Sequence, residues 1–385
     1  MVEIRDAKTQ NKISKNATTD NYNSVISKLN GLNTNFDDLI RLFANTWPNM
    51  ANDHVNSRTQ FVCIDGPSGS GKNTLLDHFE GCNDGHPLSI LDTNIFMKPR
   101  FERNDDEIDS LFRNWYRTDL FKEKLVSFLN PADITIIDQA YRHDKDGDIS
   151  HIVKILPGPF RILMGRYSLH PEIQSVFKRQ SIDTTKIIID APQSLRLKRV
   201  KQRAYVQMHR TPEEQEKLII DTVDIDWFRY FPSIFFTSDW YIVNYSDSYS
   251  TYRKPQDCIN RNHVWGAYAD LHVKTDRLYR LIEIGKNGAT SLHMHKNLDE
   301  IYLHVLGGPL GVTIRTDFDE KEVRLVPGKS LTIPHGVYHK AYALDNTPPV
   351  YYETVLPVKG STIDSNDIYK LSNAIPKSGS LTYLE

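Results

Sequence analysis

The chain has little cysteine and almost no net charge, and it lacks any long hydrophobic run. Only Cys63, Cys82 and Cys258 occur in 385 residues, without a C-x-x-C pair, so neither a disulfide framework nor a zinc knuckle is expected. A net charge of −2 lacks the basic excess of nucleic-acid coat proteins. The first residues hold no apolar signal segment, and no stretch is long enough to span a bilayer. These absences favour a cytoplasmic protein, with neither nucleic acid nor membrane expected as a partner.

The length and the change of pattern along the chain predict two domains. Residues 1–28 are polar and predict a disordered lead-in, and residues 29–250 form the first domain, which opens with an amphipathic helix at 29–47. In this part short apolar runs alternate with helical segments, which indicates an α/β fold with a parallel sheet covered by helices on both faces. The expected strands are 61–65, 88–92, 134–138, 160–165, 186–190 and 239–245.

The second predicted domain covers residues 258–385, after a boundary at 248–260. Here the helical period vanishes, and short strands follow turn signals such as "GKNG", "LGGPLG" and "VPGKS". This spacing is typical of an all-β barrel or sandwich.

A glycine-rich stretch, "GPSGSGKNTLL", lies between the first expected strand and the helix after it. Glycines in such a loop let consecutive backbone N–H groups turn toward one anion, and the helix N-terminus adds partial positive charge. A lysine at the start of the helix adds a point charge for the outer phosphates. The loop therefore predicts a site for the phosphates of a nucleotide. The alternative is a glycine-rich turn that matches the motif by chance. Its residues are Gly66, Ser68, Gly69, Ser70, Gly71, Lys72, Asn73 and Thr74.

Asn73 stands where such loops usually carry the serine or threonine that holds magnesium. An amide oxygen, directly or through water, or the hydroxyl of Thr74 is the alternative ligand for Mg²⁺. Nucleoside monophosphate kinases carry Gly-Lys-Gly-Thr at this point, so the variation is compatible with phosphoryl transfer.

Residues 60–205 resemble uridine-kinase-type P-loop phosphotransferases. The resemblance depends on "IDGPSGSGKNTL", "ILDTNIFMKP", "GRYSLHPEI" followed by "KIIIDAP", and "LRLKRVKQR". It implies ATP and Mg²⁺ as cofactors, with Asp92 near the acceptor hydroxyl, although "DTNIF" has an altered spacing and Met164 replaces a frequent glutamate. Asp138 resembles a Walker-B carboxylate. Arg199 and Arg203, four apart on one helical face, are expected to close over the phosphoryl group, the alternative being a solvated basic face.

A second motif has two halves, "HMHKNLDE" and "GKSLTIPHGVYH", and resembles the cupin signature across residues 260–360. Alternate residues of a strand share a face, so His293 and His295 point the same way, while Glu300 and His339 arrive from later segments. Three imidazoles and a carboxylate predict one divalent transition metal, either Fe, Mn, Zn or Ni. Tyr302 and His304 alternate with Glu300, and either line the same cavity or fill the barrel.

Together these motifs predict ATP-dependent phosphorylation of a hydroxyl on a nucleoside or sugar-like molecule, coupled to a metal-binding cupin that acts on or senses a related metabolite. In this interpretation Lys72, Asp92, Arg199 and Arg203 are the catalytic residues. One alternative is a nucleotide-binding regulatory protein with a ligand-sensing cupin and no turnover. Another is an enzyme like the nucleoside monophosphate kinases. Cupin barrels often pair, so a homodimer through this domain is also expected.

Overall fold

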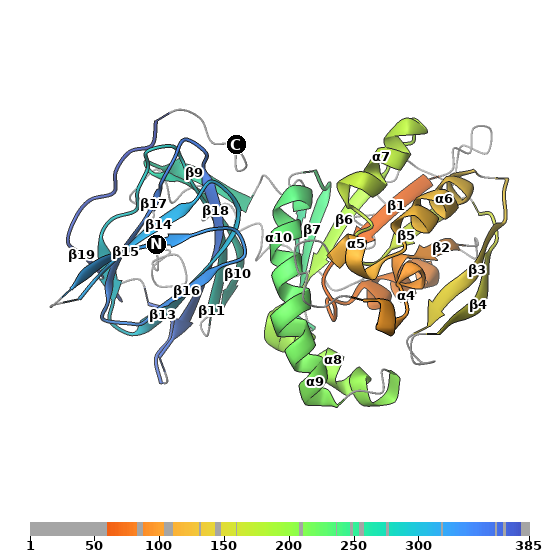
Figure 1. Ribbon diagram of the computed structural model, residues 1–385, viewed down its shortest axis with the longest axis horizontal. Coiled ribbons are helices and arrows are strands. Elements are labelled where there is room, and N and C mark those ends of the chain that lie inside the picture. Colours follow the sequence, from red (N-terminus) through yellow and green to blue (C-terminus); the bar gives the residue numbers. More distant parts are fainter. Residues whose placement is uncertain are drawn as a thin grey trace. The chain divides into compact units, whose positions relative to one another are not determined.

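The computed structural model describes residues 60–378, apart from 83–87, 104–110, 131, 143–147, 159, 208–210, 236, 247–248, 254–257, 275–276, 317–318, 359 and 365–366. The predicted lead-in at 1–28 and the predicted helix at 29–47 lie outside the described residues. The chain separates into two compact units between residues 254 and 255 (Figure 1).

A six-stranded sheet forms the centre of the N-terminal unit. Its order is β2-β5-β1-β6-β7-β8, in which the first five strands run parallel and β8 is antiparallel to β7. The strands are β1 (Gln60–Asp65), β2 (Leu88–Asp92), β5 (Phe160–Met164), β6 (Thr185–Asp190), β7 (Trp240–Asn244) and β8 (Tyr249–Arg253). The short apolar runs of the sequence form this sheet because parallel strands bury both of their faces.

Helices cover both faces of this sheet, as the alternation of side chains along β1 demonstrates. Leu75 of α4 (Lys72–Cys82) packs into one cluster with Val62 and Ile64, which face one side. Phe61 faces the other side, where it meets Phe177 of α7 (Pro171–Arg179) in an edge contact with ring centroids 6.2 Å apart. The remaining helices are α5 (Leu111–Trp115), α6 (Thr118–Leu129), α8 (Gln193–Gln207), α9 (Pro212–Leu218) and α10 (Asp224–Phe235), with short helical turns at Thr93–Phe96, Arg100–Glu102 and Ile219–Val223.

The segment 134–138 is a strand, but the prediction that it belongs to the parallel sheet is wrong. It lies in β3 (Thr135–Arg142), which pairs with β4 (Asp148–Ile155) in a separate two-stranded ribbon. Ile136 in this strand and Ile134 just before it are 42% and 51% exposed. An apolar run of β-branched residues indicates a strand without indicating its partner. The signal for β4 was the Asp-Gly turn in "HDKDG" followed by "ISHIVKI", which together are typical of a hairpin.

The C-terminal unit consists of two antiparallel sheets (Figure 1). One has the order β16-β13-β18-β11-β10-β9 and the other β15-β14-β17-β12-β19. Side chains of both sheets, such as Tyr302 and Ile282 from the first and Val312 and Ala341 from the second, meet in one buried cluster, so the core lies between the sheets. The all-β expectation for this part is confirmed. The strands are β9 (Ile259–His263), β10 (Gly266–Lys274), β11 (Arg277–Ile284), β12 (His293–His295), β13 (Leu298–Gly307), β14 (Leu310–Arg315), β15 (Glu320–Leu325), β16 (Ser330–Ile333), β17 (Tyr338–Ala343), β18 (Pro349–Pro357) and β19 (Ile368–Lys370).

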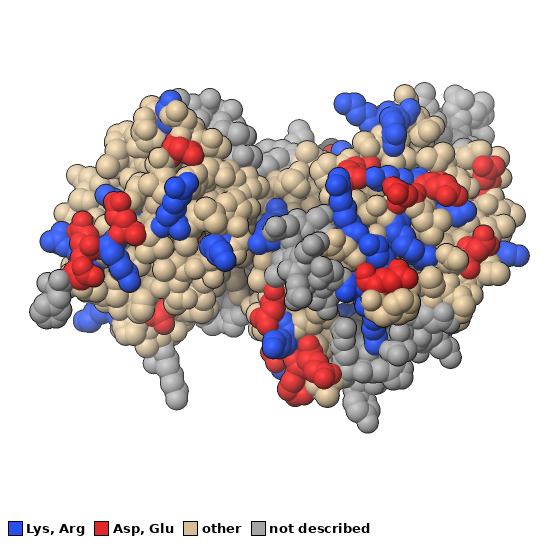
Figure 2. All heavy atoms as spheres, viewed as in Figure 1, with Lys and Arg blue, Asp and Glu red and all other residues tan. Residues whose placement is uncertain are grey.

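Charges on the surface are mixed in sign. On the face drawn in Figure 2, basic and acidic side chains are interspersed on each unit, with an acidic group over α9, whose first turn carries Glu213 and Glu214. Among the described helices, none combines the length and the apolar character needed to cross a membrane. Cys63 and Cys258 are both buried, and no disulfide joins them.

Candidate metal centre and glycine-rich loop

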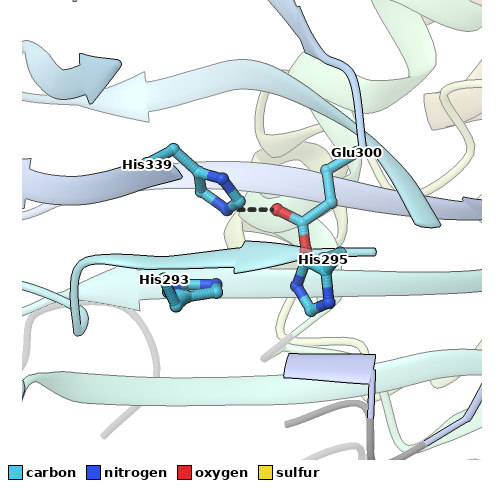
Figure 3. A group of neighbouring side chains, drawn as sticks. All are labelled: His293, His295, Glu300 and His339. Atoms are coloured by element: carbon cyan, nitrogen blue, oxygen red, sulfur yellow. Dashed lines mark ion pairs between the residues drawn. The ribbon is translucent and has the colours of Figure 1, made fainter. Parts of the chain in front are cut away.

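Four potential metal ligands converge between the two sheets of the C-terminal unit (Figure 3). They are His293, His295, Glu300 and His339, each at most 2% exposed. One ligand atom from each residue can be chosen so that all four atoms lie within 4.8 Å of one another. The residues that the two-part motif predicts as ligands are therefore brought together by the fold.

The strands explain why these four side chains meet. His293 and His295 are alternate residues of β12, so they share a face, and His293 is paired across the strands with His339 of β17. Glu300 belongs to β13 in the opposite sheet. The inward faces of both sheets thus supply the cluster, and its donors point into the core.

A carboxylate between two imidazoles sets the electrostatics of this cluster. The Glu300 oxygens Oε1 and Oε2 lie 2.9 Å from His295 Nε2 and 2.9 Å from His339 Nε2, respectively. Burial alone would raise the pKa of Glu300, but the two imidazoles outweigh it and hold that pKa well below its usual range. Burial, with His339 next to it, lowers the pKa of His293 far below its ordinary value. Burial acts to lower the pKa of His339, but the Glu300 carboxylate outweighs it and raises that pKa overall. Glu300 is therefore an anionic donor and His293 a neutral one, and a cation that binds would displace a proton from His339.

The donor set fits a divalent transition metal. Three imidazole nitrogens and one carboxylate oxygen suit Fe, Mn, Zn or Ni. They suit Mg²⁺ or Ca²⁺ less well, because these ions prefer oxygen ligands only. Two of the imidazoles are also oriented for such a role. His293 Nδ1 lies 2.7 Å from the carbonyl oxygen of Ser291, and His339 Nδ1 lies 3.1 Å from that of Val337. Because a carbonyl only accepts, Nδ1 carries a proton in both residues, which for His293 leaves the lone pair on Nε2 for a metal. Nε2 of His339 lies against the Glu300 carboxylate and would release its proton when a metal binds.

The structure separates the roles of Tyr302 and His304. The Tyr302 hydroxyl donates to Glu300 Oε2 over 2.8 Å, so this side chain borders the cluster. His304 has its two ring nitrogens 3.1 Å and 2.7 Å from the carbonyl oxygens of Val350 and Gly308. His304 therefore serves the barrel itself, which is the filling role that the sequence left open.

A buried row of charges continues from Tyr302 across the same face of the sheet. Tyr302 is paired with Glu353 of β18, Glu353 with Arg280 of β11, and Arg280 with Asp270 of β10. Arg280 Nε donates to Asp270 Oδ1 over 2.7 Å, and its Nη1 donates to Glu353 Oε2 over 3.3 Å. Buried charges are tolerated when paired in this way, so the polar interior extends well beyond the ligands.

In the N-terminal unit the glycine-rich loop joins β1 to α4, as predicted. Lys72 Nζ donates to the carbonyl oxygens of Gly66 and Pro67 over 2.7 Å and 3.0 Å. A Cβ atom at Gly66 would lie 2.0 Å from the carbonyl oxygen of Ile189, and Gly69 has a φ of +81°. Only glycine meets both conditions without strain, so the sequence is matched to this tight backbone path.

The Lys72 ammonium lies among carboxylates at the carboxyl ends of the strands. Burial lowers the pKa of Lys72 to about 8, although the carboxylates of Asp65 and Asp92 act in the opposite direction. Asp92 ends β2 and accepts a hydrogen bond from the backbone N–H of Asn94 over 2.8 Å. Burial raises the pKa of Asp92. Lys72 and Asp92, predicted to act together, are thus electrostatic neighbours.

Both predicted arginines of α8 lie at the loop. Arg199 donates to the carbonyl oxygen of Gly69 over 2.9 Å and to Asn244 Oδ1 over 3.2 Å. Arg203 donates to the Arg199 carbonyl over 3.4 Å, and its charge also acts on Lys72. Arg199 therefore contacts the loop directly, whereas Arg203 bonds the backbone of its own helix and acts on Lys72 through its charge. Of the other loop residues, Ser70 is buried, Ser68 is half-buried, and Asn73 and Thr74 are exposed.

Asp138 does not lie at a strand end of the parallel sheet. It is exposed on β3 in the separate ribbon, so the strand position that suggested a Walker-B role is absent. Asp65 and Asp190, which the sequence analysis did not select, end β1 and β6 and act electrostatically on Lys72. Their signal was present in the sequence, since "FVCID" and "KIIID" both end in aspartate and parallel strands end at one edge.

Comparisons with known proteins add little to this geometry. No protein-family model and no curated protein matches the chain. Among solved structures, it is similar to KdgF from Halomonas sp. (20% identity, 24% of this chain and 81% of that chain, TM-score 0.21). It is also similar to the protein TT1209 from Thermus thermophilus (21% identity, 24% and 82%, TM-score 0.22). Oxalate decarboxylase from Bacillus subtilis is 18% identical over 29% of each chain, with a TM-score of 0.25. Similarities this low establish neither a family nor an activity.

Proposed function

We propose that the C-terminal unit is a cupin that holds one divalent ion, Fe, Mn, Zn or Ni, and uses it to bind a small oxygen-containing metabolite. The observation that supports this proposal is the convergence of four buried donors, His293, His295, Glu300 and His339, from two facing sheets. A bound metal of this kind would polarise a carbonyl or hydroxyl oxygen of the ligand. Tyr302 holds the Glu300 carboxylate in place. Such a site is compatible with an enzyme that converts the bound metabolite and with a sensor that only binds it.

We propose further that the N-terminal unit is an ATP-dependent kinase for a small-molecule hydroxyl. Support comes from the order of strand, glycine loop and helix, with Lys72 placed beside Asp92 and Arg203. Loop amides and Lys72 would bind the phosphates, Arg203 would neutralise developing charge, and Asp92 would orient the acceptor hydroxyl or take its proton. The exposed side chains of Asn73 and Thr74 offer oxygen ligands for Mg²⁺.

The nucleoside or sugar-like nature of the acceptor is part of this proposal, because kinases take the hydroxyl of such compounds and metal-dependent cupins take their carbonyl forms. ATP consumption across a panel of nucleosides, nucleoside monophosphates and sugars tests it. Turnover with one class identifies the acceptor. ATP binding without turnover on any of them favours the regulatory alternative. A homodimer through the C-terminal unit stays a prediction, to be checked by the mass of the protein in solution.

The pKa of Lys72 predicts a pH dependence of ATP binding. Only the ammonium form of Lys72 attracts phosphates. Because the pKa of Lys72 is about 8, most Lys72 side chains are protonated at pH 7 and few are protonated at pH 9. Affinity for ATP is therefore expected to fall about tenfold between these pH values, as Lys72 loses its proton. Calorimetry at pH 7, 8 and 9 measures this change. A Lys72→Ala variant is the control for ionisation of ATP itself, and an identical pH dependence in both proteins would contradict the assignment.

A further inference from the structure

One of the three imidazoles in the metal cluster differs from the other two in its surroundings. His293 and His339 each have Nδ1 within hydrogen-bond distance of a backbone carbonyl oxygen. The Nδ1 atom of His295 is buried and, among the described residues, has no hydrogen-bond partner. Metal-binding histidines almost always donate this second N–H to an acceptor, so His295 needs an acceptor that the strand itself does not supply.

The carboxylate of Asp367 lies in the right place to be this acceptor. Its Oδ2 is 4.0 Å from His295 Nδ1, and the residue is 5% exposed. Asp367 is itself held firmly: its two oxygens accept from the backbone N–H of Asn297 over 3.0 Å and 2.9 Å, and Oδ1 also accepts from Asn297 Nδ2 over 3.0 Å. A shift of about 1 Å brings the pair to hydrogen-bond length.

The C-terminal segment is fixed to the strand that carries the ligands. β19 pairs antiparallel with β12, so that Ile368 stands opposite His295 and Lys370 opposite His293. Upstream, Ile363 is 1% exposed and packs against Leu278, Leu298 and Val355. Asp367 lies between these two attachments, which gives its carboxylate a defined position beside the cluster.

We propose that Asp367 is the positioning residue of His295: its carboxylate accepts the Nδ1–H and thereby directs Nε2 toward the metal. The C-terminal segment is then part of the metal centre, although more than sixty residues separate Asp367 from the first half of the motif. This inference rests on the proposed metal function. It adds a carboxylate that acts through a ligand and does not itself touch the metal.

An Asp367→Asn variant tests the proposal through metal affinity. Metal-free protein is titrated with Co²⁺ in competition with a chelator, and the visible spectrum of bound Co²⁺ reports on the ligand geometry. We expect affinity to fall about 10- to 100-fold, because removing such an outer carboxylate has effects of this size. The melting temperature of the metal-free variant should stay near that of the wild type, since asparagine retains an oxygen for the Asn297 N–H.

Two further variants distinguish positioning from a general structural role. Asn297→Ala removes one contact of the same carboxylate but leaves the charge, and should change Co²⁺ affinity by less than about threefold. In a His295→Ala background, Asp367→Asn should cause no additional loss, because its effect passes through the absent imidazole. An equal loss in both backgrounds, or no loss in the single variant, would overturn the role of Asp367. Wild-type protein that binds no Co²⁺ would instead overturn the metal function itself.

Discussion

Replacing Lys72 with alanine is expected to abolish phosphoryl transfer while the metal content of the protein stays unchanged. Lys72 is the one loop side chain with a full positive charge, and its ammonium donates hydrogen bonds to the carbonyl oxygens of Gly66 and Pro67. When a nucleotide binds, the same charge is available for the β- and γ-phosphates. Loss of one such electrostatic group lowers turnover by roughly a hundred- to a thousandfold in comparable sites. Initial rates of ATP consumption measure the loss of turnover, and calorimetry with MgATP measures the loss of nucleotide binding. Elemental analysis checks that the metal content is unchanged.

Lys201→Ala is the matched control for this variant. Lys201 lies on α8 between Arg199 and Arg203, but its ammonium pairs with Glu216 on the neighbouring helix α9. Its loss removes the same charge from the same unit and should leave ATP binding within about twofold, because exposed ion pairs contribute little. Normal phosphorylation by the Lys72 variant would show that the loop does not bind the nucleotide. An equal defect in both variants would point to net charge or folding.

In the N-terminal unit, the sequence predicted which segments form strands better than it predicted which strands pair with each other. Buried apolar runs such as "FVCID" and "KIIID" specify parallel strands, because both faces need apolar cover. The run "ITIID" at 134–138 is similarly rich in apolar β-branched residues, yet β3 pairs with β4 outside the sheet. β4 is the next strand along the chain, and the intervening segment "HDKDG" contains an Asp-Gly turn signal. The apolar runs taken one at a time do not reveal this pairing. Asp138 was misplaced for that reason, whereas Lys72 and Asp92, which both follow strands of the parallel sheet, do interact electrostatically.

The metal centre shows the same limit from another side. His293 and His295 could be recognised together because alternate positions of one strand share a face, and His339 because its turn has a recognisable Pro/Gly pattern. Asp367 had no such signal. Its proposed role is to accept a hydrogen bond from His295, and any carboxylate that the fold brings to this point could do so. The position of Asp367 beside His295 therefore becomes apparent only when the pairing of β12 with β19 is known.

Purified protein is expected to contain about one first-row transition ion per chain, and His339→Ala should lose it. His339 supplies one of four donors, and removing a direct ligand should weaken binding by more than the 10- to 100-fold effect of an outer residue. Elemental analysis gives the metal content. Melting curves give a second readout, since added metal raises the melting temperature only of a protein that binds it when folded.

His335→Ala is the control that the motif itself provides. His335 lies four residues before His339 in "PHGVYH", but it is half exposed. Its Nδ1 lies 2.8 Å from Asp299 Oδ1, within hydrogen-bond distance. It should keep the metal and the metal-dependent rise in melting temperature, because it is not among the converging donors. Equal losses in both variants would argue against the buried cluster as the site. Wild-type protein that is metal-free after growth in metal-replete medium would count against any metal function. The four side chains would then form a buried polar cluster in which Glu300 pairs with His295 and His339.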